Sequence, residues 1–458
     1  MINQIFQYMK LNRSNLSFLI AIIICCQSIY SQEYLSTLHK QNPLTSDQWQ
    51  SLFPNRAGLN PGHPQGYTTD FFSYNNFTQA RNEMADYLVK IRKKQGINGE
   101  LITITKKSSK VVYNYSDVEA SWYSNTTPET IINVDFADFI NTSNSVNNTR
   151  ELGAFLANIS KETTGGWQTP VGGGSLGDYA RWGLYFVHEL GYNVTNSAGA
   201  YSQASTEYPA NPTKGYYGRG PIQLSWNYNY GQFSKFLYND KNVLLNNPDL
   251  IQQDGVLAFK SAIWFWMMPQ WPKPSCHQVM HDLWVPNIGE YAMNKMYLKG
   301  FAHTNNIING GLECRSSSSS VFTVKVALRS DLYKYYLGIL GLNSNQIAGE
   351  DSGQYTTTCF QETSNAMQDY QSANVLATKC FDLENFIYSP NPVQENLTIQ
   401  YKKNIDQIVI YGLDGKEIQK IPIQKTSAEL DSNKFEKGIY LLKVISEGES
   451  AIFRIVKN

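Results

Sequence analysis

The stretch NTRELGAFLANISKETTGG, residues 148–166, combines an apolar helical stripe with a carboxylate near its far end. The spacing predicts one helix with a buried face, formed by Leu152, Phe155, Leu156 and Ile159. Asn148 or Thr149 is expected to cap this helix, with Glu151 behind the cap. Glu162 continues the apolar face by one further turn, and a Gly-Gly pair then ends the helix.

The position of Glu162 suggests a role in proton transfer. Apolar neighbours and the negative end of the helix dipole both favour a protonated carboxyl group there. A carboxyl group that keeps its proton near neutral pH is suited to general acid catalysis. A solvated glutamate at a helix end is the alternative, and this stretch by itself leaves both interpretations open.

A second carboxylate follows in YARWGLYFVHELGY, residues 179–192. Trp182 and Glu189 lie two helical turns apart, so the pattern predicts a second helix that ends at Gly191 and carries Glu189 on an aromatic face. Two carboxylates are the minimum for glycoside hydrolysis, in which one protonates the leaving oxygen and the other activates water or attacks. A single histidine such as His188 is more often structural than catalytic.

The 458-residue chain has 38 basic and 38 acidic residues, and this balance gives no indication of a nucleic-acid partner. Lys10 and Arg13 precede the apolar run LSFLIAIIICC, so residues 1–31 are expected to form a cleaved signal peptide. Export leads to an oxidising compartment, where disulfides form. Four cysteines would remain, without metal-binding spacing: Cys276, Cys314, Cys359 and Cys380.

From Phe386 the sequence changes to short alternating strands separated by turn residues. This pattern predicts a small β-sandwich over 386–458, preceded by a linker over 363–385. The segments SPNPVQENLTI, IYGLDGKEI and GIYLLKV resemble the C-terminal sorting domain of the type IX secretion system. The resemblance implies export across an outer membrane, with the secretion machinery as partner. A carbohydrate-binding β-module is the alternative, although this tail contains no tryptophan to stack on a sugar.

The larger region resembles the catalytic domain of glycoside hydrolase family 19 chitinases in four blocks: FLANISKETTGGW, YYGRGPIQLSWNYNYG, KPSCHQVM and TNNIINGGLEC. With weaker similarity on either side, the resemblance extends over 44–362 and includes an insertion at about 83–133. It implies a mainly α fold, namely a two-lobed, lysozyme-like helical domain with a substrate cleft between the lobes. The buried central helix is expected within GVLAFKSAIWFWMMP, residues 255–269, which is apolar nearly all round.

The resemblance also implies residue roles. Glu162 matches the general acid of the family, Glu189 the general base, and Ser225 the residue that holds the attacking water. The family's substrate-contacting positions correspond to Thr164, Gln223, Tyr228, Asn229 and Asn309.

A supporting set lies behind the acid in the same comparison. Glu313 and Arg329 match a buried charge network, and Cys314 is expected to pair with Cys359. Lys161 stands where the family has a histidine, which adds a charge beside Glu162.

The leading hypothesis is therefore a secreted, inverting endochitinase that acts on chitin or chitin oligosaccharides. It is expected to act as a monomer, without a cofactor, a metal or nucleic acid, and to be either released or attached to the cell surface. One alternative is a peptidoglycan-cleaving glycosidase on the same fold. The other is a sugar-binding homologue without activity.

Overall fold

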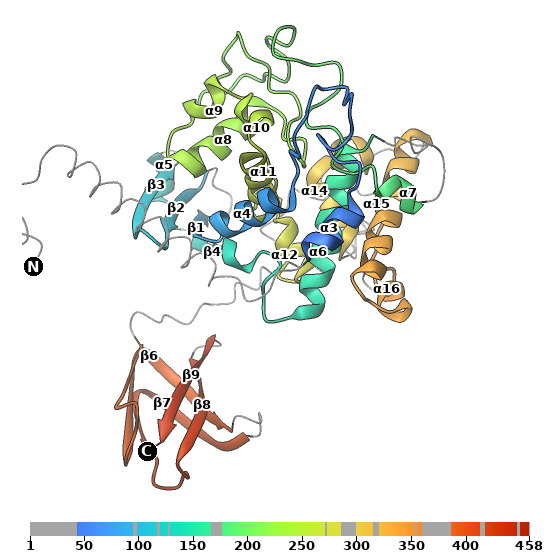
Figure 1. The fold of residues 1–458 in the computed structure, drawn as a ribbon. Coiled ribbons are helices and arrows are strands. Elements are labelled where there is room, and N and C mark those ends of the chain that lie inside the picture. The colour runs from blue at the N-terminus through green and yellow to red at the C-terminus, as the bar shows by residue number, and fades with distance from the viewer. Residues whose placement is uncertain are drawn as a thin grey trace, which may run out of the picture. The chain divides into compact units, whose positions relative to one another are not determined.

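The fold of the chain is seen in a computed structural model (Figure 1). The chain divides into two compact units, Met1–Val375 and Leu376–Asn458, each with its own hydrophobic core. The predicted signal peptide, the linker and Cys380 lie outside the described residues. Those residues are 44–94, 99–116, 120–126, 129–165, 176–270, 273–284, 299–314, 320–352, 355–359, 386–412, 417–446 and 449–457.

The first unit is built mainly from helices. Helices α3 (Ser46–Leu52) and α4 (Tyr74–Met84) precede a small sheet, and a short 3-10 helix, η1 (Phe136–Asp138), follows it. The later helices are α6 (Ser145–Thr163), α7 (Leu176–Ala180), α8 (Asn227–Tyr238), α9 (Asn242–Asn246), α10 (Leu250–Gln253), α11 (Gly255–Met267), α12 (Cys276–Met280), α14 (Phe301–Glu313), α15 (Ser320–Ile339) and α16 (Ser344–Gly349).

Helix α6 contains the predicted apolar stripe of Leu152, Phe155, Leu156 and Ile159, and it begins earlier than predicted. Asn144 is the N-cap, and its side chain accepts a hydrogen bond from the backbone N–H of Asn147 at 3.0 Å. The predicted cap at Asn148 or Thr149 is wrong, because both residues already lie inside the first turns. The predicted buried face is confirmed, since all four of its apolar side chains are in the core.

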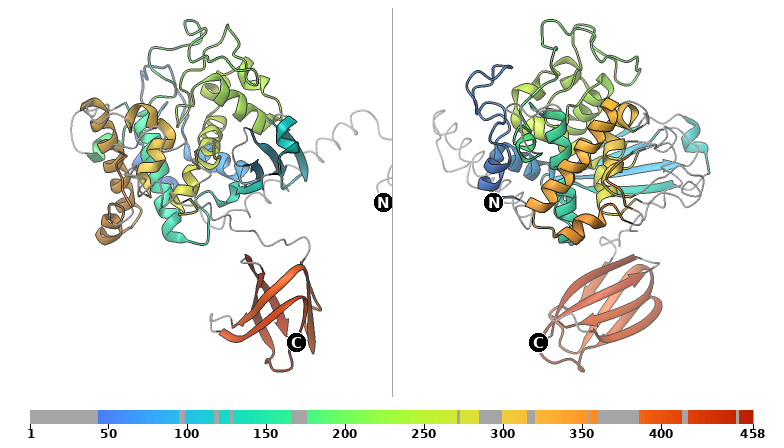
Figure 2. Two further views of the ribbon diagram at one scale, coloured as in Figure 1. Left: turned by 180° about the vertical axis from the view of Figure 1, so that it is seen from behind. Right: turned by 90° about the vertical axis from the view of Figure 1, so that its right-hand side faces the viewer.

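Helix α11 is buried almost completely, as its apolar sequence predicts. It packs against α4, and α6 packs against α15, which in turn contacts α14. Phe155 of α6 meets Trp266 of α11 edge to face, with ring centroids 5.4 Å apart. Figure 2 shows α6, α14 and α15 side by side. These three helices carry the acidic side of the site described below.

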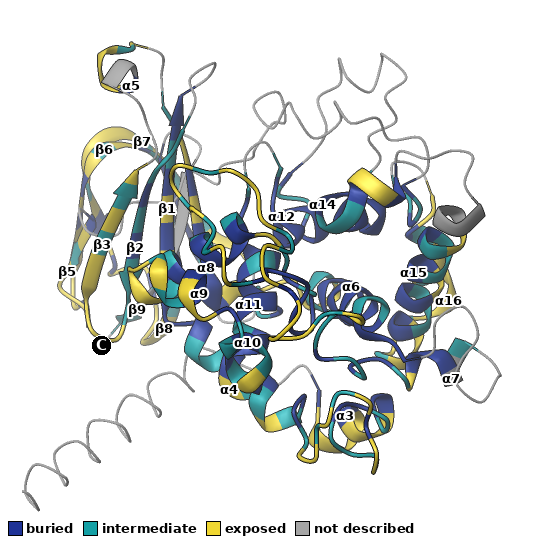
Figure 3. Ribbon diagram, turned by 90° about the horizontal axis from the view of Figure 1, so that it is seen from above, coloured by how far each residue is buried: buried dark blue, intermediate teal, exposed yellow. Residues whose placement is uncertain are grey.

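A four-stranded antiparallel sheet occupies most of the predicted insertion. Its order is β3 (Val111–Ser116), β2 (Leu101–Lys106), β1 (Tyr87–Lys94) and β4 (Glu129–Asp135), with the short α5 (Ala120–Ser124) before β4. Inward residues of the central strand, such as Val89 and Ile91, join the helical core, while the edge strand β3 is largely exposed (Figure 3). The prediction of a mainly α chain is therefore not confirmed, because this sheet adds to the β-structure of the second unit.

The second unit is an antiparallel β-structure, as predicted. Its strands are β5 (Phe386–Ser389), β6 (Asn396–Tyr411), β7 (Glu417–Asp431), β8 (Gly438–Ser446) and β9 (Glu449–Lys457). The long strand β6 pairs with β7, β5 and β8, and register shifts after Gln400 interrupt its pairing with β7. Alternate residues of β6, including Leu397 and Ile399, fill a core separate from that of the first unit.

In the described ranges of the chain, none of the helices combines the length and the apolar character that crossing a bilayer requires.

Candidate active site

The first unit contains a cavity of about 1020 Å³ that brings together the predicted catalytic and substrate-binding residues. The cavity is also lined by Lys161, Tyr201 and Trp226. Eight predicted residues line it, although they come from segments far apart in the sequence: Glu162, Thr164, Glu189, Gln223, Ser225, Tyr228, Asn229 and Asn309.

One side of the cavity, which we call the acid wall, consists of Glu162 and the buried charges behind it. Glu162 lies at the end of α6, and its side chain is 19% exposed. Arg329 of α15 is fully buried and forms an ion pair with the Glu162 carboxylate. Glu162 therefore has a charged partner in addition to the apolar neighbours that the helix pattern predicts.

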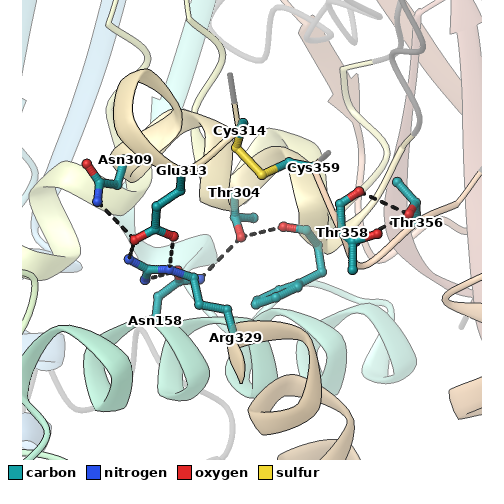
Figure 4. Close-up of a disulfide and its surroundings, with 10 residues drawn as sticks. Asn158, Thr304, Asn309, Glu313, Cys314, Arg329, Thr356, Thr358 and Cys359 are labelled. Carbon is teal, nitrogen blue, oxygen red and sulfur yellow. Dashed lines mark hydrogen bonds and ion pairs between the residues drawn. A yellow bond between two sulfur atoms is a disulfide. The ribbon is translucent and has the colours of Figure 1, made fainter. Parts of the chain in front are cut away.

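The same arginine holds Glu313 through two hydrogen bonds of 2.8 and 2.9 Å (Figure 4). Its remaining terminal nitrogen donates to the side-chain oxygen of Asn158 at 3.0 Å. Asn309 also donates to Glu313, at 3.0 Å, from a kink inside α14 where its backbone leaves helical values. The planar guanidinium thus connects two carboxylates and two helices, as a bidentate arginine can.

The charge states of the acid wall follow from this pairing. Burial by itself would raise the pKa of Glu313, but Arg329 outweighs it and brings the pKa down to about 2. Burial would lower the pKa of Arg329, but Glu162 and Glu313 outweigh it and raise the pKa. For Lys161 the balance is reversed: burial, followed by the repulsion of Arg329, outweighs the attraction of Glu162 and Glu313 and lowers the pKa of its ammonium group to about 8.

The disulfide between Cys314 and Cys359 is present, as expected, and lies directly beside this network (Figure 4). Cys314 follows Glu313 at the end of α14, so the bond ties this helix end to the segment around Thr357. Cys276 is a free, buried thiol whose pKa is raised by burial.

A second part of the cavity lining, which we call the base wall, carries Glu189 and contains no helix at that position. Helix α7 ends at Ala180, and the following residues form turns and a single bridge to the segment around Arg219. The predicted helix ending at Gly191 is therefore wrong. Leu184 has a φ of +59°, which a right-handed helix excludes.

Long-range hydrogen bonds replace that helix. The backbone N–H groups of Tyr185 and Phe186 both donate to the carbonyl oxygen of Thr163, at 3.2 and 2.8 Å. The N–H of Glu189 donates to the carbonyl oxygen of Gly218 at 2.9 Å. These backbone groups are paired with segments that are distant in the sequence, and not with residues one turn away as in a helix. Tertiary structure therefore overrides the local pattern.

The Glu189 carboxylate has two hydrogen-bond donors in the described part of the chain. The phenol of Tyr201 donates to Oε1 at 2.7 Å, and the backbone N–H of Gly218 donates to Oε2 at 3.3 Å. Neither donor carries a charge, in contrast to the acid wall. Tyr201 was not singled out from the sequence, where only its position 12 residues after Glu189 was available as a signal.

The segment 223–229 completes the base wall. Ser225 Oγ donates to the carbonyl oxygen of Gln223 at 2.9 Å, and Asn229 Nδ2 donates to the carbonyl oxygen of Ser225 at 2.8 Å. Trp226 and Tyr228 line the cavity with nearly parallel rings, 15° apart in orientation. On the acid wall, Thr164 is the C-cap of α6 and lies almost fully buried.

A buried cluster outside the cavity joins α6 to α12. The oxygens of Glu151 accept from Trp266 Nε1 at 2.9 Å and from the backbone N–H of Ile140 at 2.8 Å. They also contact His277 Nδ1 at 2.7 Å and His281 Nε2 at 2.9 Å. The two histidines, four residues apart in the sequence, were the signal that the sequence analysis missed.

These contacts are hydrogen bonds by their lengths. Because a carboxylate only accepts, each of the two ring nitrogens carries a hydrogen, and four donors occupy both oxygens of Glu151. The geometry is that of a saturated hydrogen-bond network more than that of a cation site. Burial would lower the pKa of His277, but Glu151 outweighs it and raises the pKa.

The comparisons with known proteins assign both units of the chain. A family model described as class I chitinase matches residues 114–350, and one described as a secretion system C-terminal sorting domain matches residues 387–458. The chain is 45% identical over 207 residues to endochitinase A2 of Pisum sativum, which covers 45% of this chain and 58% of that protein. It is 46% identical over 211 residues to the basic 30 kDa endochitinase of Solanum lycopersicum, which covers 46% of this chain and 60% of that protein.

The matched part therefore spans less than two thirds of these plant proteins. Among solved structures, chitinase C from Streptomyces griseus aligns with 70% of this chain and 99% of its own, at 23% identity and a TM-score of 0.40.

Proposed function

Because the chain belongs to the class I chitinase family, we propose that it is a secreted endochitinase that cleaves β-1,4-linked N-acetylglucosamine polymers with inversion. The observation that carries the proposal is the pairing of two differently supported carboxylates in one cavity. An inverting glycosidase needs this division, since one carboxyl group donates a proton while the other accepts one.

In the proposed reaction, Glu162 protonates the oxygen that links two sugars as the bond from that oxygen to the anomeric carbon breaks. The carboxylate left on Glu162 faces Arg329, whose positive charge stabilises it as it forms. The acid wall thus favours the charge that the first half of the reaction creates.

On the other face of the sugar, water attacks the anomeric carbon and gives a proton to Glu189. The Ser225 hydroxyl donates its own hydrogen to a backbone carbonyl, so its oxygen is available to accept from the attacking water. Glu189 ends the step protonated and Glu162 ends it ionised, and both states are restored by exchange with solvent. The net reaction adds one water across the glycosidic bond.

The substrate contacts are proposed by position. Gln223, Tyr228 and Asn229 lie on the base wall, while Thr164 and Asn309 lie on the acid wall, so a sugar chain in the cavity would meet both. Asn309 also contacts Glu313, and through it the substrate would be connected to the charge network.

The second unit is proposed to direct export, as its match to a secretion sorting domain suggests, and to be removed near residue 386 after transport. The intact mass of the protein in culture medium tests this. A mature chain that still ends in Lys457 and Asn458 would contradict removal.

The activity itself is tested with N-acetylglucosamine oligomers of defined length, purified cell walls and the purified catalytic unit. We expect internal cleavage of chitin oligomers of four or more sugars. Cleavage of cell walls with no cleavage of chitin oligomers would favour a peptidoglycan-cleaving enzyme instead. Binding without any cleavage would favour a sugar-binding homologue.

A further inference from the structure

Of the hydrogen bonds that the described residues make to the Glu189 carboxylate, the one from Tyr201 is the shortest. Its phenol donates to Glu189 Oε1 at 2.7 Å, while the N–H of Gly218 reaches the other oxygen at 3.3 Å. Because each oxygen accepts one hydrogen bond, the orientation of the carboxylate plane is fixed. Each oxygen still has a lone pair that can accept from another partner. In the acid wall this task is performed by a charged guanidinium, which the base wall lacks.

Tyr201 is itself held firmly. Its backbone has a φ of +53°, a conformation that residues other than glycine rarely adopt. The neighbouring backbone is fixed by hydrogen bonds from Tyr216 N to the Ala200 carbonyl at 2.8 Å and from Asn227 N to the Tyr201 carbonyl at 3.3 Å. Such strained positions persist where the surrounding structure determines them, and they cluster at functional sites.

The ring of Tyr201 is also confined. It packs edge to face against two rings: the centroid of Tyr192 is 5.6 Å away and that of Trp226 is 5.2 Å away. Burial, followed by the hydrogen bond to Glu189, raises the pKa of the phenol, so the hydroxyl keeps its hydrogen throughout the range in which a glycosidase works. It therefore acts as a donor to Glu189 at every such pH.

We propose that Tyr201 is a positioning residue that fixes the orientation of the Glu189 carboxylate toward the attacking water. This inference rests on the proposed function, in which Glu189 is the general base. Because each oxygen accepts one hydrogen bond, the carboxylate cannot rotate freely, and the lone pair that would accept the proton keeps one direction. A misplaced base loses rate even when the substrate still binds.

The test compares wild-type enzyme with Tyr201→Phe and with the control Tyr192→Phe, on one chitin oligomer across the pH range. Tyr201→Phe removes only the hydroxyl and keeps the ring. We expect its kcat to fall about tenfold with KM within about twofold, because orientation matters in the reaction and not in binding.

Tyr192→Phe serves as the control because Tyr192 packs against Tyr201 and Tyr217 without donating to either carboxylate. Its kcat and KM should match those of the wild type, and all three proteins should melt at the same temperature. An unchanged kcat in Tyr201→Phe would overturn the role of Tyr201, as would an equal fall of kcat in Tyr192→Phe. A wild-type enzyme that cleaves no oligomer would instead overturn the proposed function, and this inference with it.

Discussion

The acid wall and the base wall of the cavity face the same space but are built differently. Glu162 lies on a 19-residue helix and pairs with Arg329, a fully buried charge that also holds Glu313. Glu189 lies on a turn-rich segment and is held by a phenol and a backbone N–H. On the acid wall, the contacts that position the proposed acid also belong to the folded core, whereas the proposed base is positioned by contacts at the edge of the cavity.

This difference separates stability from activity. Removing one partner of a buried charge network leaves the others without compensation, and this destabilises the fold. Removing a neutral donor at the edge of a cavity costs much less, because water can replace it. Substitutions on the acid wall should therefore reduce both stability and turnover, while those on the base wall should reduce turnover alone.

The largest effect is expected for Arg329→Ala. This change leaves Glu313 buried without its partner, so the free energy of unfolding should fall by about 3–5 kcal/mol, and kcat should fall by at least about a hundredfold. Urea unfolding and steady-state kinetics measure the two quantities. Unchanged melting together with unchanged turnover would remove the distinction between the walls.

Arg150→Ala is a matched control for that substitution. Arg150 is equally buried on α6 and holds Glu350 at 2.5 and 3.2 Å, but it lies about 18 Å along the helix from Glu162. Its loss should destabilise the protein by a similar amount and leave the kcat of the folded fraction unchanged. A large fall in kcat there would mean that lost stability alone explains Arg329→Ala.

On the base wall, Ser225→Ala should lower kcat by about tenfold to a hundredfold, because the attacking water loses a hydrogen-bond partner. Among the residues that the structure describes, the Ser225 hydroxyl bonds to one neighbouring carbonyl, so the melting temperature should change by less than about 2 °C. Kinetics and a thermal melt on the same sample check both. A strong loss of stability would show that the base wall also belongs to the core.

A smaller, pH-dependent effect is expected at Lys161. Its pKa is about 8 in the folded protein and near its ordinary 10.5 when unfolded, so the unfolded chain binds more protons between those values. Stability of the wild type should therefore rise with pH across that window. Lys161→Met should melt about 2 °C higher than wild type at pH 6, with the difference disappearing above about pH 10.5. A difference independent of pH would contradict this account.

The smallest effect is expected from deleting residues 386–458. The second unit has its own core, so the first unit expressed alone should keep its kcat within about twofold. Loss of activity in a protein of unchanged helix content by circular dichroism would show that the tail contributes to the site.

The sequence predicted the acid wall better than the base wall for a physical reason. Helices α6 and α11 are held by hydrogen bonds between residues that are close in the sequence. The spacing of their apolar residues therefore predicts which side chains are buried. The helix predicted through Glu189 failed because its apparent periodicity is overridden by hydrogen bonds to Thr163 and Gly218, which no local pattern reports.

Other features were missed for the same reason. Glu151 was assigned to the start of α6, yet its partners His277 and His281 lie more than a hundred residues away. The contact between Tyr201 and Glu189 depends on a positive φ at a residue that is not glycine. The eight predicted residues that line the cavity were found by resemblance to known blocks, and periodicity alone would not have identified them.

The stereochemistry of the first product tests the division of labour between the walls most directly. Proton NMR of a chitin oligomer mixed with fresh enzyme distinguishes the α- and β-anomers before they interconvert. If Glu162 donates the proton while Glu189 delivers water to the opposite face, the α-anomer appears first from the β-linked substrate, and Glu162→Gln produces neither anomer. The β-anomer appearing first, or near-normal cleavage by Glu162→Gln, would contradict the account.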